Sequence, residues 1–244
     1  MAIPARATTV TFGPTRRDVE NWEPRVTEVI GRFTTASNAT LLAATELDET
    51  VIYKPVAGER PLRDFAPGTL AIREVLTYRI DRALGFDLVP ETTIGDGPYG
   101  PGAVQRYVEH DEAFDPLPLV RSADPLLWPM AVLDLVCNNA DRKLGHVLRL
   151  GERMVAVDHG LTFHAEAKLR TVLWGYAGRP IPTDLVDSVE RLGEALDDHL
   201  GQEFDRRLTA AELDALRRRV EDLIVDPVHP EPPTDRPALP WPPY

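Results

Sequence analysis

Alternation of apolar and polar residues predicts several β-strands in the first half of the chain. The expected strands are 26–30, 41–44, 50–54, 89–94 and 103–108. Pro55 ends the third strand, because proline has no backbone N–H to donate within a sheet. A Gly/Pro-rich stretch at 95–102 predicts the turn between the last two strands.

One helix interrupts these strands. Between Thr69 and Leu84 apolar residues recur at the spacing of one helix face. Thr69 is suited to cap the start of this helix, and Gly85 is suited to end it. The glycines and prolines of 57–68 predict a loop before the helix.

The second half of the chain is expected to be mostly helical. The expected helices are 125–138, 183–200 and 208–224. The first of them is apolar on nearly all faces, which predicts that it is buried. Between the first and second helices, 147–150 and 154–157 are expected to pair as a hairpin that turns at 151–153.

This order of elements predicts an α+β protein with two main parts. Residues 1–24 are polar and contain several prolines, so we expect a mobile arm. Residues 25–109 form the β-rich part with its one helix. Residues 110–226 form the mostly helical part, which begins with an acid- and proline-rich connector at 110–124. Residues 227–244 are a Pro-rich, extended tail that is either disordered or laid on the surface.

Composition and charge narrow the function classes. The 244-residue chain is 43% hydrophobic and 27% charged, which is typical of soluble globular proteins, and its formal net charge is −12. Because nucleic acids and anionic membranes are themselves polyanions, we expect neither as a partner. The single cysteine, Cys137, the lack of a signal peptide and the lack of a long apolar segment predict a cytoplasmic protein without membrane insertion.

Polar residues gather directly after the buried helix, in the segment 138–146. If the hairpin pairs as predicted, His146 and Asp158 lie at the same open end, and Asp141 precedes them closely. Two carboxylates and an imidazole at one mouth can bind a divalent cation and orient a hydroxyl nucleophile. The alternative is that Asp141 is an ordinary loop carboxylate and that Asp158 belongs to a simple turn.

Candidate phosphate contacts lie in the β-rich part. Lys54 ends an apolar strand and Glu74 follows on the helix, so a pair between them would hold the ammonium for phosphates. Alternatively, Lys54 is an edge residue with its ammonium in solvent, and Glu74 is part of a solvated helix face. The turn 31–40, which includes Ser37, offers backbone N–H groups and hydroxyls to phosphates, but it is equally a plain hairpin.

Two motifs carry a resemblance to known families. The segment Asp141-Arg142-Lys143-Leu144-Gly145-His146 resembles the catalytic loop Asp-Arg-His/Asn-x-x-Asn of phosphatidylinositol 3-/4-kinases and HipA-type bacterial kinases. Asp158-His159-Gly160 resembles their metal motif Asp-x-Gly. From about residue 31 onward, the chain is similar to an actinobacterial family of phosphatidylinositol 3-/4-kinase-like proteins. The segments that support this narrower resemblance are Tyr53-Lys54-Pro55, 58–62, 68–74, 139–143 and Pro240-Trp241-Pro242.

The resemblance implies a two-lobed protein-kinase-like fold with ATP and Mg²⁺ as cofactors. It places Asp141, Arg142 and Lys143 in the catalytic loop, where Asp141 would orient or deprotonate the acceptor hydroxyl. It assigns Asp158 to the metal ion. His146 stands where the families have a metal-binding Asn. Because imidazole suits softer ions than Mg²⁺, His146 either does not touch the metal or shifts the preference toward Mn²⁺.

The resemblance also implies which residues contact the nucleotide. Lys54 would contact the phosphates, and Glu74 would brace Lys54. The strand 103–108 would lead into the connector between the lobes, where the adenine bonds to the backbone. Gln105 and Val108 are the candidates there because of their position and not because of their side chains.

The expected function is transfer of phosphate from ATP to a hydroxyl of an unidentified protein or small molecule. Two alternatives remain. One is a catalytically weak, pseudokinase-like nucleotide-binding regulator, which His146 at the Asn position and the glycine-poor turn favour. The other is an AMP transferase on the same fold. A lipid acceptor has little support, because enzymes that act on anionic lipids gain from basic surfaces.

Overall fold

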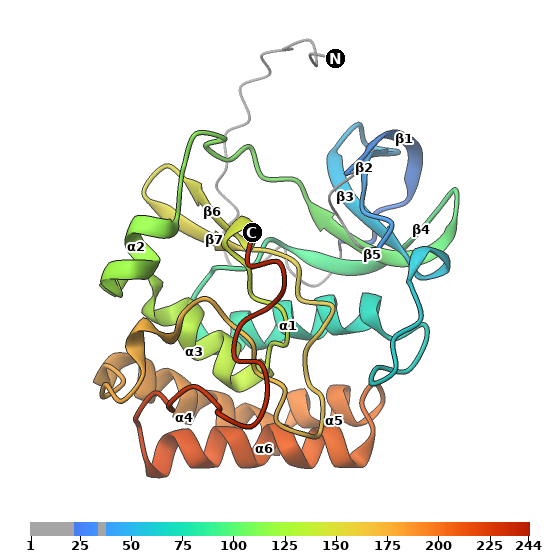
Figure 1. Ribbon diagram of the computed structural model, residues 1–244. Coiled ribbons are helices and arrows are strands. Elements are labelled where there is room, and N and C mark those ends of the chain that lie inside the picture. Colours follow the sequence, from blue (N-terminus) through green and yellow to red (C-terminus); the bar gives the residue numbers. More distant parts are fainter. Residues whose placement is uncertain (1–21, 34–37) are drawn as a thin grey trace.

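The computed structural model describes residues 22–33 and 38–244, and it begins with an antiparallel sheet (Figure 1). The strands are β1 (Val26–Arg32), β2 (Leu41–Thr45), β3 (Thr50–Pro55), β4 (Thr92–Gly97) and β5 (Gly100–Arg106). They are ordered β1-β2-β3-β5-β4 across the sheet. The helix α1 (Leu70–Leu84) packs against β4 and β5. The expected strands and their one helix are confirmed.

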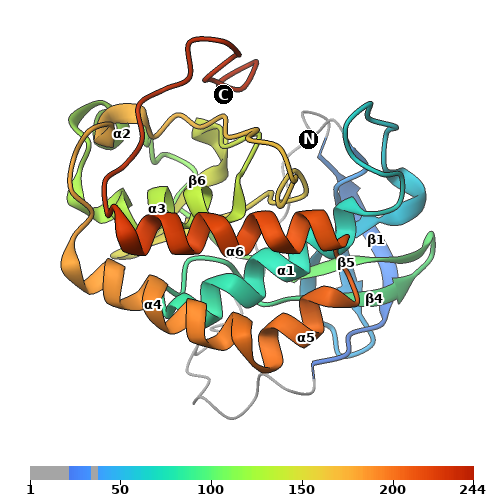
Figure 2. The same ribbon diagram turned by 90° about the horizontal axis from the view of Figure 1, so that it is seen from below.

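The following region is mostly helical. Its helices are α2 (Leu117–Ser122), α3 (Trp128–Cys137), α4 (Thr183–Asp197), α5 (His199–Asp205) and α6 (Ala210–Val225). β6 (Val147–Leu150) and β7 (Arg153–Ala156) form the expected hairpin. Figure 1 shows α4, α5 and α6 below α1, which lies between them and the sheet, and Figure 2 shows these three helices from below. No helix within the described residues is both long and apolar enough to cross a membrane.

Alternation along β3 directs Lys54 toward α1. Val51 and Tyr53 are fully buried in a small apolar core on one face of the sheet. Since successive residues of a strand point to opposite faces, Lys54 lies on the other face. There its ammonium meets Glu74 of α1. The expected helix end is also present, because Gly85 adopts the left-handed conformation that glycine tolerates best.

The Gly/Pro-rich stretch at 95–102 is not a long turn. β4 and β5 remain paired as far as Gly97 and Gly100, so only the residues between them turn. A Cβ on Gly102 would stand 2.4 Å from the carbonyl oxygen of Lys54. Glycine is therefore needed there for the close approach of two strands. The prediction was wrong because glycine marks tight packing as well as turns.

Boundaries differ in the helical region as well. The connector contains the short helix α2, which the sequence did not indicate. The expected helix at 183–200 is divided at Asp198, whose backbone (φ −116°, ψ −132°) is not helical. The hairpin turn is Gly151-Glu152, one residue shorter than expected, because β7 already begins at Arg153.

The chain ends are partly described. Of the expected arm 1–24, residues 1–21 lie outside the described residues. Trp22 packs on the sheet, where its indole N–H donates to Glu49 at 3.0 Å and the Arg106 guanidinium lies 4.3 Å from the ring centroid. The Pro-rich tail at 227–244 is laid on the surface of the helical region, which is one of the two expected possibilities (Figure 1).

Candidate active site

Three predicted residues from distant parts of the chain meet at one point. The Lys54 ammonium on β3 contacts Oε1 of Glu74 on α1, and it lies 2.9 Å from Oδ1 of Asp158, which follows β7. The other oxygen of Glu74 accepts the backbone N–H of His159 at 2.9 Å. Glu74 therefore links the strand lysine to the segment that carries Asp158. Neither Lys54 nor Glu74 is a solvated surface residue.

Charges within this cluster stabilise one another. Burial acts to lower the pKa of Lys54, but the carboxylates of Asp158 and Glu74 outweigh it and raise that pKa. Desolvation acts to raise the pKa of Asp158, yet the ammonium of Lys54 outweighs it and holds this pKa well below its ordinary value. The side chain of Asp158 is still 49% exposed. A charged carboxylate is thus accessible to solvent at this point.

His146 also reaches Asp158, as the hairpin geometry predicts. Its Nε2 lies 3.3 Å from Oδ2 of Asp158. Its Nδ1 accepts the backbone N–H of Lys143 at 3.4 Å. Burial lowers the pKa of His146 to about 4, so the ring is neutral at pH 7.

Asp141 lies in the loop between α3 and the hairpin. Its backbone N–H donates to the Asn139 side chain at 3.0 Å, and its Oδ2 lies 3.1 Å from the Lys143 ammonium. Burial raises the pKa of Asp141 to about 6, with Lys143 opposing and the charge of Asp158 adding to the rise. A carboxylate with this pKa is matched to taking up a proton near neutral pH.

Arg142 directs its side chain into the protein rather than toward solvent. Its side chain is fully buried, and its guanidinium pairs with Asp134 of α3 at 2.9 Å. It also donates to the carbonyl of Val157 at 3.0 Å and lies 2.8 Å from Nε2 of His159. Arg142 thus ties the loop after α3 to α3 itself and to the segment that carries Asp158.

In the described parts of the chain, no side-chain hydrogen bond joins the other predicted nucleotide-binding residues to the cluster around Lys54. Gln105 is buried on β5 and donates its side-chain amide to Thr92 at 2.8 Å. Val108 is half-buried just beyond β5, and its carbonyl contacts the His110 ring at 3.1 Å. Ser37 lies outside the described residues.

The acidic residues suit a metal ion that arrives with a nucleotide. Within the described parts of the chain, no group of three or more His, Cys, Asp or Glu side chains is arranged to hold a metal. Protein sites for Mg²⁺ with nucleotides usually supply one or two carboxylates, while phosphates and water complete the shell. The half-exposed carboxylate of Asp158 fits that role.

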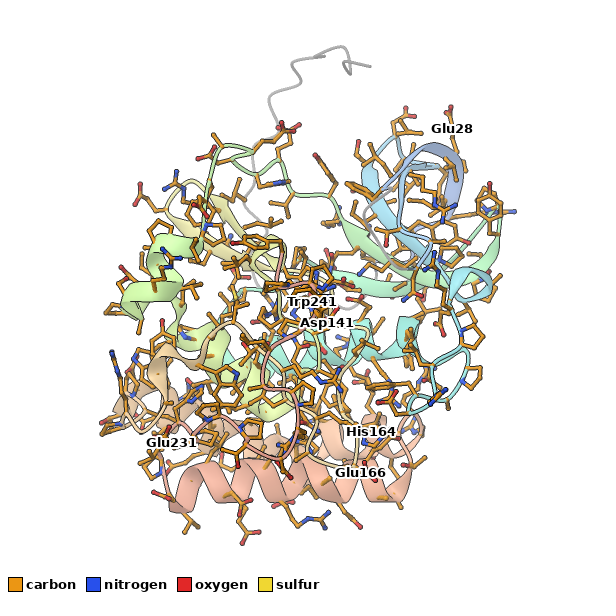
Figure 3. The ribbon with its side chains drawn as sticks, in the orientation of Figure 1. Glu28, Asp141, His164, Glu166, Glu231 and Trp241 are labelled. Carbon is orange, nitrogen blue, oxygen red and sulfur yellow. The ribbon has the colours of Figure 1, made fainter. Side chains whose placement is uncertain are left out.

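Sequence reasoning missed the buried supports of the site. Asp134 is bonded by Arg142, by the Asn139 amide at 2.9 Å and by the Thr171 hydroxyl at 3.1 Å. The signal was available, because Asp134 is the one charged residue within the apolar helix, and a buried charge requires partners. A second missed feature is the tail, whose Pro243 carbonyl accepts the backbone N–H of Leu144 at 2.9 Å; Figure 3 labels Trp241 of the tail and Asp141 of the loop.

The sheet with its one helix and the helical region form a protein-kinase-like fold, as similar solved structures show. The Helicobacter pylori proinflammatory kinase CtkA is similar over 82% of this chain and 94% of its own (TM-score 0.53, 14% identity). The Golgi casein kinase with Mn/ADP bound is similar over 83% and 72% (TM-score 0.55, 12% identity). A hydra Fam20 crystallised with sugar is similar over 83% and 85% (TM-score 0.50, 14% identity).

Sequence similarity assigns the chain to a family, which is narrower than a fold. No protein-family model matches the chain. Protein Rv2133c of Mycobacterium tuberculosis (strain ATCC 25618 / H37Rv) is 41% identical over 253 residues, which cover 88% of this chain and 91% of that protein. The chain belongs to the family of Rv2133c. The predicted kinase-like fold is confirmed, while the finer resemblance to phosphatidylinositol 3-/4-kinases and HipA-type kinases stays a prediction.

Proposed function

We propose that this protein is an ATP- and Mg²⁺-dependent phosphotransferase that acts on a hydroxyl group. The observation that carries the proposal is the meeting of Lys54, Glu74 and Asp158 at the junction of the sheet and the helical region. Phosphoryl transfer needs a cation near the phosphates and a carboxylate for the metal. The Golgi casein kinase, which shares the fold, was crystallised with Mn/ADP.

The proposed reaction uses Asp141 as the base. The acceptor oxygen forms a bond to the γ-phosphorus of ATP, and the bond from that phosphorus to the β–γ bridging oxygen breaks. The acceptor proton passes to the Asp141 carboxylate, and ADP leaves. Lys143, whose ammonium lies 3.1 Å from Asp141, would stabilise negative charge on the transferred group.

The remaining residues position these groups. Lys54, braced by Glu74, would contact the phosphates. Asp158 would hold a Mg²⁺ ion, which when bound neutralises charge on the phosphate oxygens. Arg142, which is buried, acts through Asp134 and His159 as a positioning residue. In this proposal residues 25–109 form the nucleotide-binding lobe and 110–226 the catalytic lobe, with the adenine bonded near Val108.

Two variants separate binding from chemistry. Asp158→Asn is expected to weaken ATP·Mg²⁺ binding by about tenfold or more, because it removes a charged metal ligand. Asp141→Asn is expected to keep that affinity while ATP hydrolysis falls by about 10²-fold or more, because the base is lost. Glu152→Gln, in the exposed hairpin turn, is the matched control for loss of a carboxylate.

Calorimetric titration and an ATP-turnover assay on the full chain provide these measurements. Wild-type protein that fails to bind ATP·Mg²⁺ contradicts the proposal. So does full turnover by both variants.

A further inference from the structure

The end of the tail is fixed against the catalytic loop. The Ala238 carbonyl accepts the backbone N–H of Thr171 at 3.1 Å and the indole N–H of Trp174 at 2.8 Å. Further along, the Pro243 carbonyl accepts the backbone N–H of Leu144 at 2.9 Å. Leu144 lies in the catalytic-loop segment that begins at Asp141. The tail is therefore held on both sides of Trp241.

This fixed segment presents large apolar side chains to solvent. Trp241 is 90% exposed, Tyr244 is 73% exposed and Leu239 is 53% exposed, whereas Pro240 between them is buried. The Pro243 carbonyl, two residues after Trp241, bonds to Leu144, which lies three residues after Asp141. An exposed tryptophan on a fixed backbone is unfavourable in water, and tryptophan and tyrosine are the residues most enriched at binding hot spots.

We infer that Leu239, Trp241 and Tyr244 form the acceptor-binding surface of the proposed kinase, and that the acceptor is a protein segment with a serine or threonine. This inference rests on the proposed function. The backbone hydrogen bonds hold Trp241 in place before binding, so little conformational freedom is lost when a partner packs on it.

The shape of the site favours a protein over a small molecule. Small-molecule sites are concave and bury most of their ligand. A side chain as exposed as Trp241 provides a raised apolar contact, which suits the broad surface of a polypeptide.

Peptide phosphorylation by the full chain tests the inference. The probes are pools of peptides with a central serine or threonine and degenerate flanking positions, used with labelled ATP and Mg²⁺. Trp241→Ala is expected to raise KM for the best pool by about tenfold or more, the loss typical of a hot-spot aromatic, while the Kd for ATP stays unchanged. Trp241→Phe should recover part of this loss. Tyr99→Ala, an exposed aromatic on the β4–β5 turn, is the control and should behave as wild type.

The outcomes separate this inference from the proposed function. Wild-type protein that does not bind ATP·Mg²⁺ refutes the proposed function itself. Wild-type protein that binds and hydrolyses ATP but phosphorylates no pool, or phosphorylates phosphatidylinositol vesicles instead, refutes the protein acceptor. An unchanged KM in Trp241→Ala refutes the role of the tail.

Discussion

The imidazole of His146 faces the carboxylate of Asp158. The backbone N–H of Lys143 points at Nδ1 of His146, so the ring proton resides on Nε2, which lies 3.3 Å from Oδ2 of Asp158. With a pKa of about 4, His146 is neutral at pH 7. A ring nitrogen that carries a proton cannot bind a metal ion. The geometry therefore favours the alternative in which His146 orients Asp158 and does not touch the metal.

This relationship predicts an unchanged metal preference in His146→Asn. The ratio of the activities with Mg²⁺ and Mn²⁺ should match that of wild type, because the imidazole is not a ligand. His146→Ala removes the polar contact with the charged Asp158 carboxylate and should weaken ATP·Mg²⁺ binding by about tenfold, or ~1.5 kcal/mol. Titrations of both metals on the three proteins measure this. A shift of His146→Asn toward Mg²⁺ would restore the Mn²⁺ hypothesis.

The pKa of Asp141 predicts how the rate of ATP hydrolysis falls on the acidic side of its pH profile. The base must be ionised, so the rate of ATP hydrolysis should fall as the pH drops through the Asp141 pKa of about 6. The Lys143 ammonium lowers this pKa, so Lys143→Met should move the limb to higher pH, whatever its effect on the maximal rate. Lys143→Arg keeps the charge and should leave the limb in place. Coincident limbs in wild type and Lys143→Met would show that another group is the base.

Local sequence patterns located most strands and helices, although not α2, and they indicated the main residues of the candidate site. Period-two alternation located β3, and the hairpin length placed His146 beside Asp158. Both depend on interactions between residues close in the chain, which sequence patterns record directly. Lys54 and Glu74 required one further step, a strand packed against the next helix.

Long-range contacts were not predictable in the same way. The resemblance placed Arg142 among the catalytic residues, but the structure buries its side chain against Asp134. An unpaired aspartate inside an apolar helix would be costly, so Asp134 requires such a partner. Nothing local to the tail indicates that Pro243 meets Leu144. Such contacts depend on how distant segments fold together.

The buried contacts of Arg73 lead us to predict that the position of α1 controls nucleotide binding. Arg73 is buried next to Glu74, and it pairs with Glu212 of α6 at 2.5 Å and with the carbonyl of Thr162 at 2.5 Å. Removing one partner of a buried pair costs about 3–5 kcal/mol of unfolding free energy. Arg73→Ala should therefore unfold at lower denaturant concentration, and its remaining folded fraction should bind ATP·Mg²⁺ more weakly as Glu74 shifts.

The same helix supplies the control for this prediction. Arg79 pairs with Glu203 at 3.4 Å, and both side chains are more than a third exposed. Arg79→Ala should cost no more than about 1 kcal/mol and leave ATP affinity unchanged. Equal effects of the two substitutions would mean that the Arg73 contacts do not hold α1.

Arg142 and Asp134 should behave as one energetic unit. Their pair is fully buried, so Arg142→Ala or Asp134→Ala alone leaves an uncompensated charge and should cost about 3–5 kcal/mol of unfolding free energy. The double substitution removes both charges and should cost less than the sum of the single substitutions, by a coupling energy of about 0.5–3 kcal/mol. Denaturant unfolding of the four proteins gives the cycle. Additive costs would show that Arg142 stabilises the fold mainly through Val157 and His159. In that case the hydrogen bonds from Asn139 and Thr171 would be what stabilises the Asp134 carboxylate.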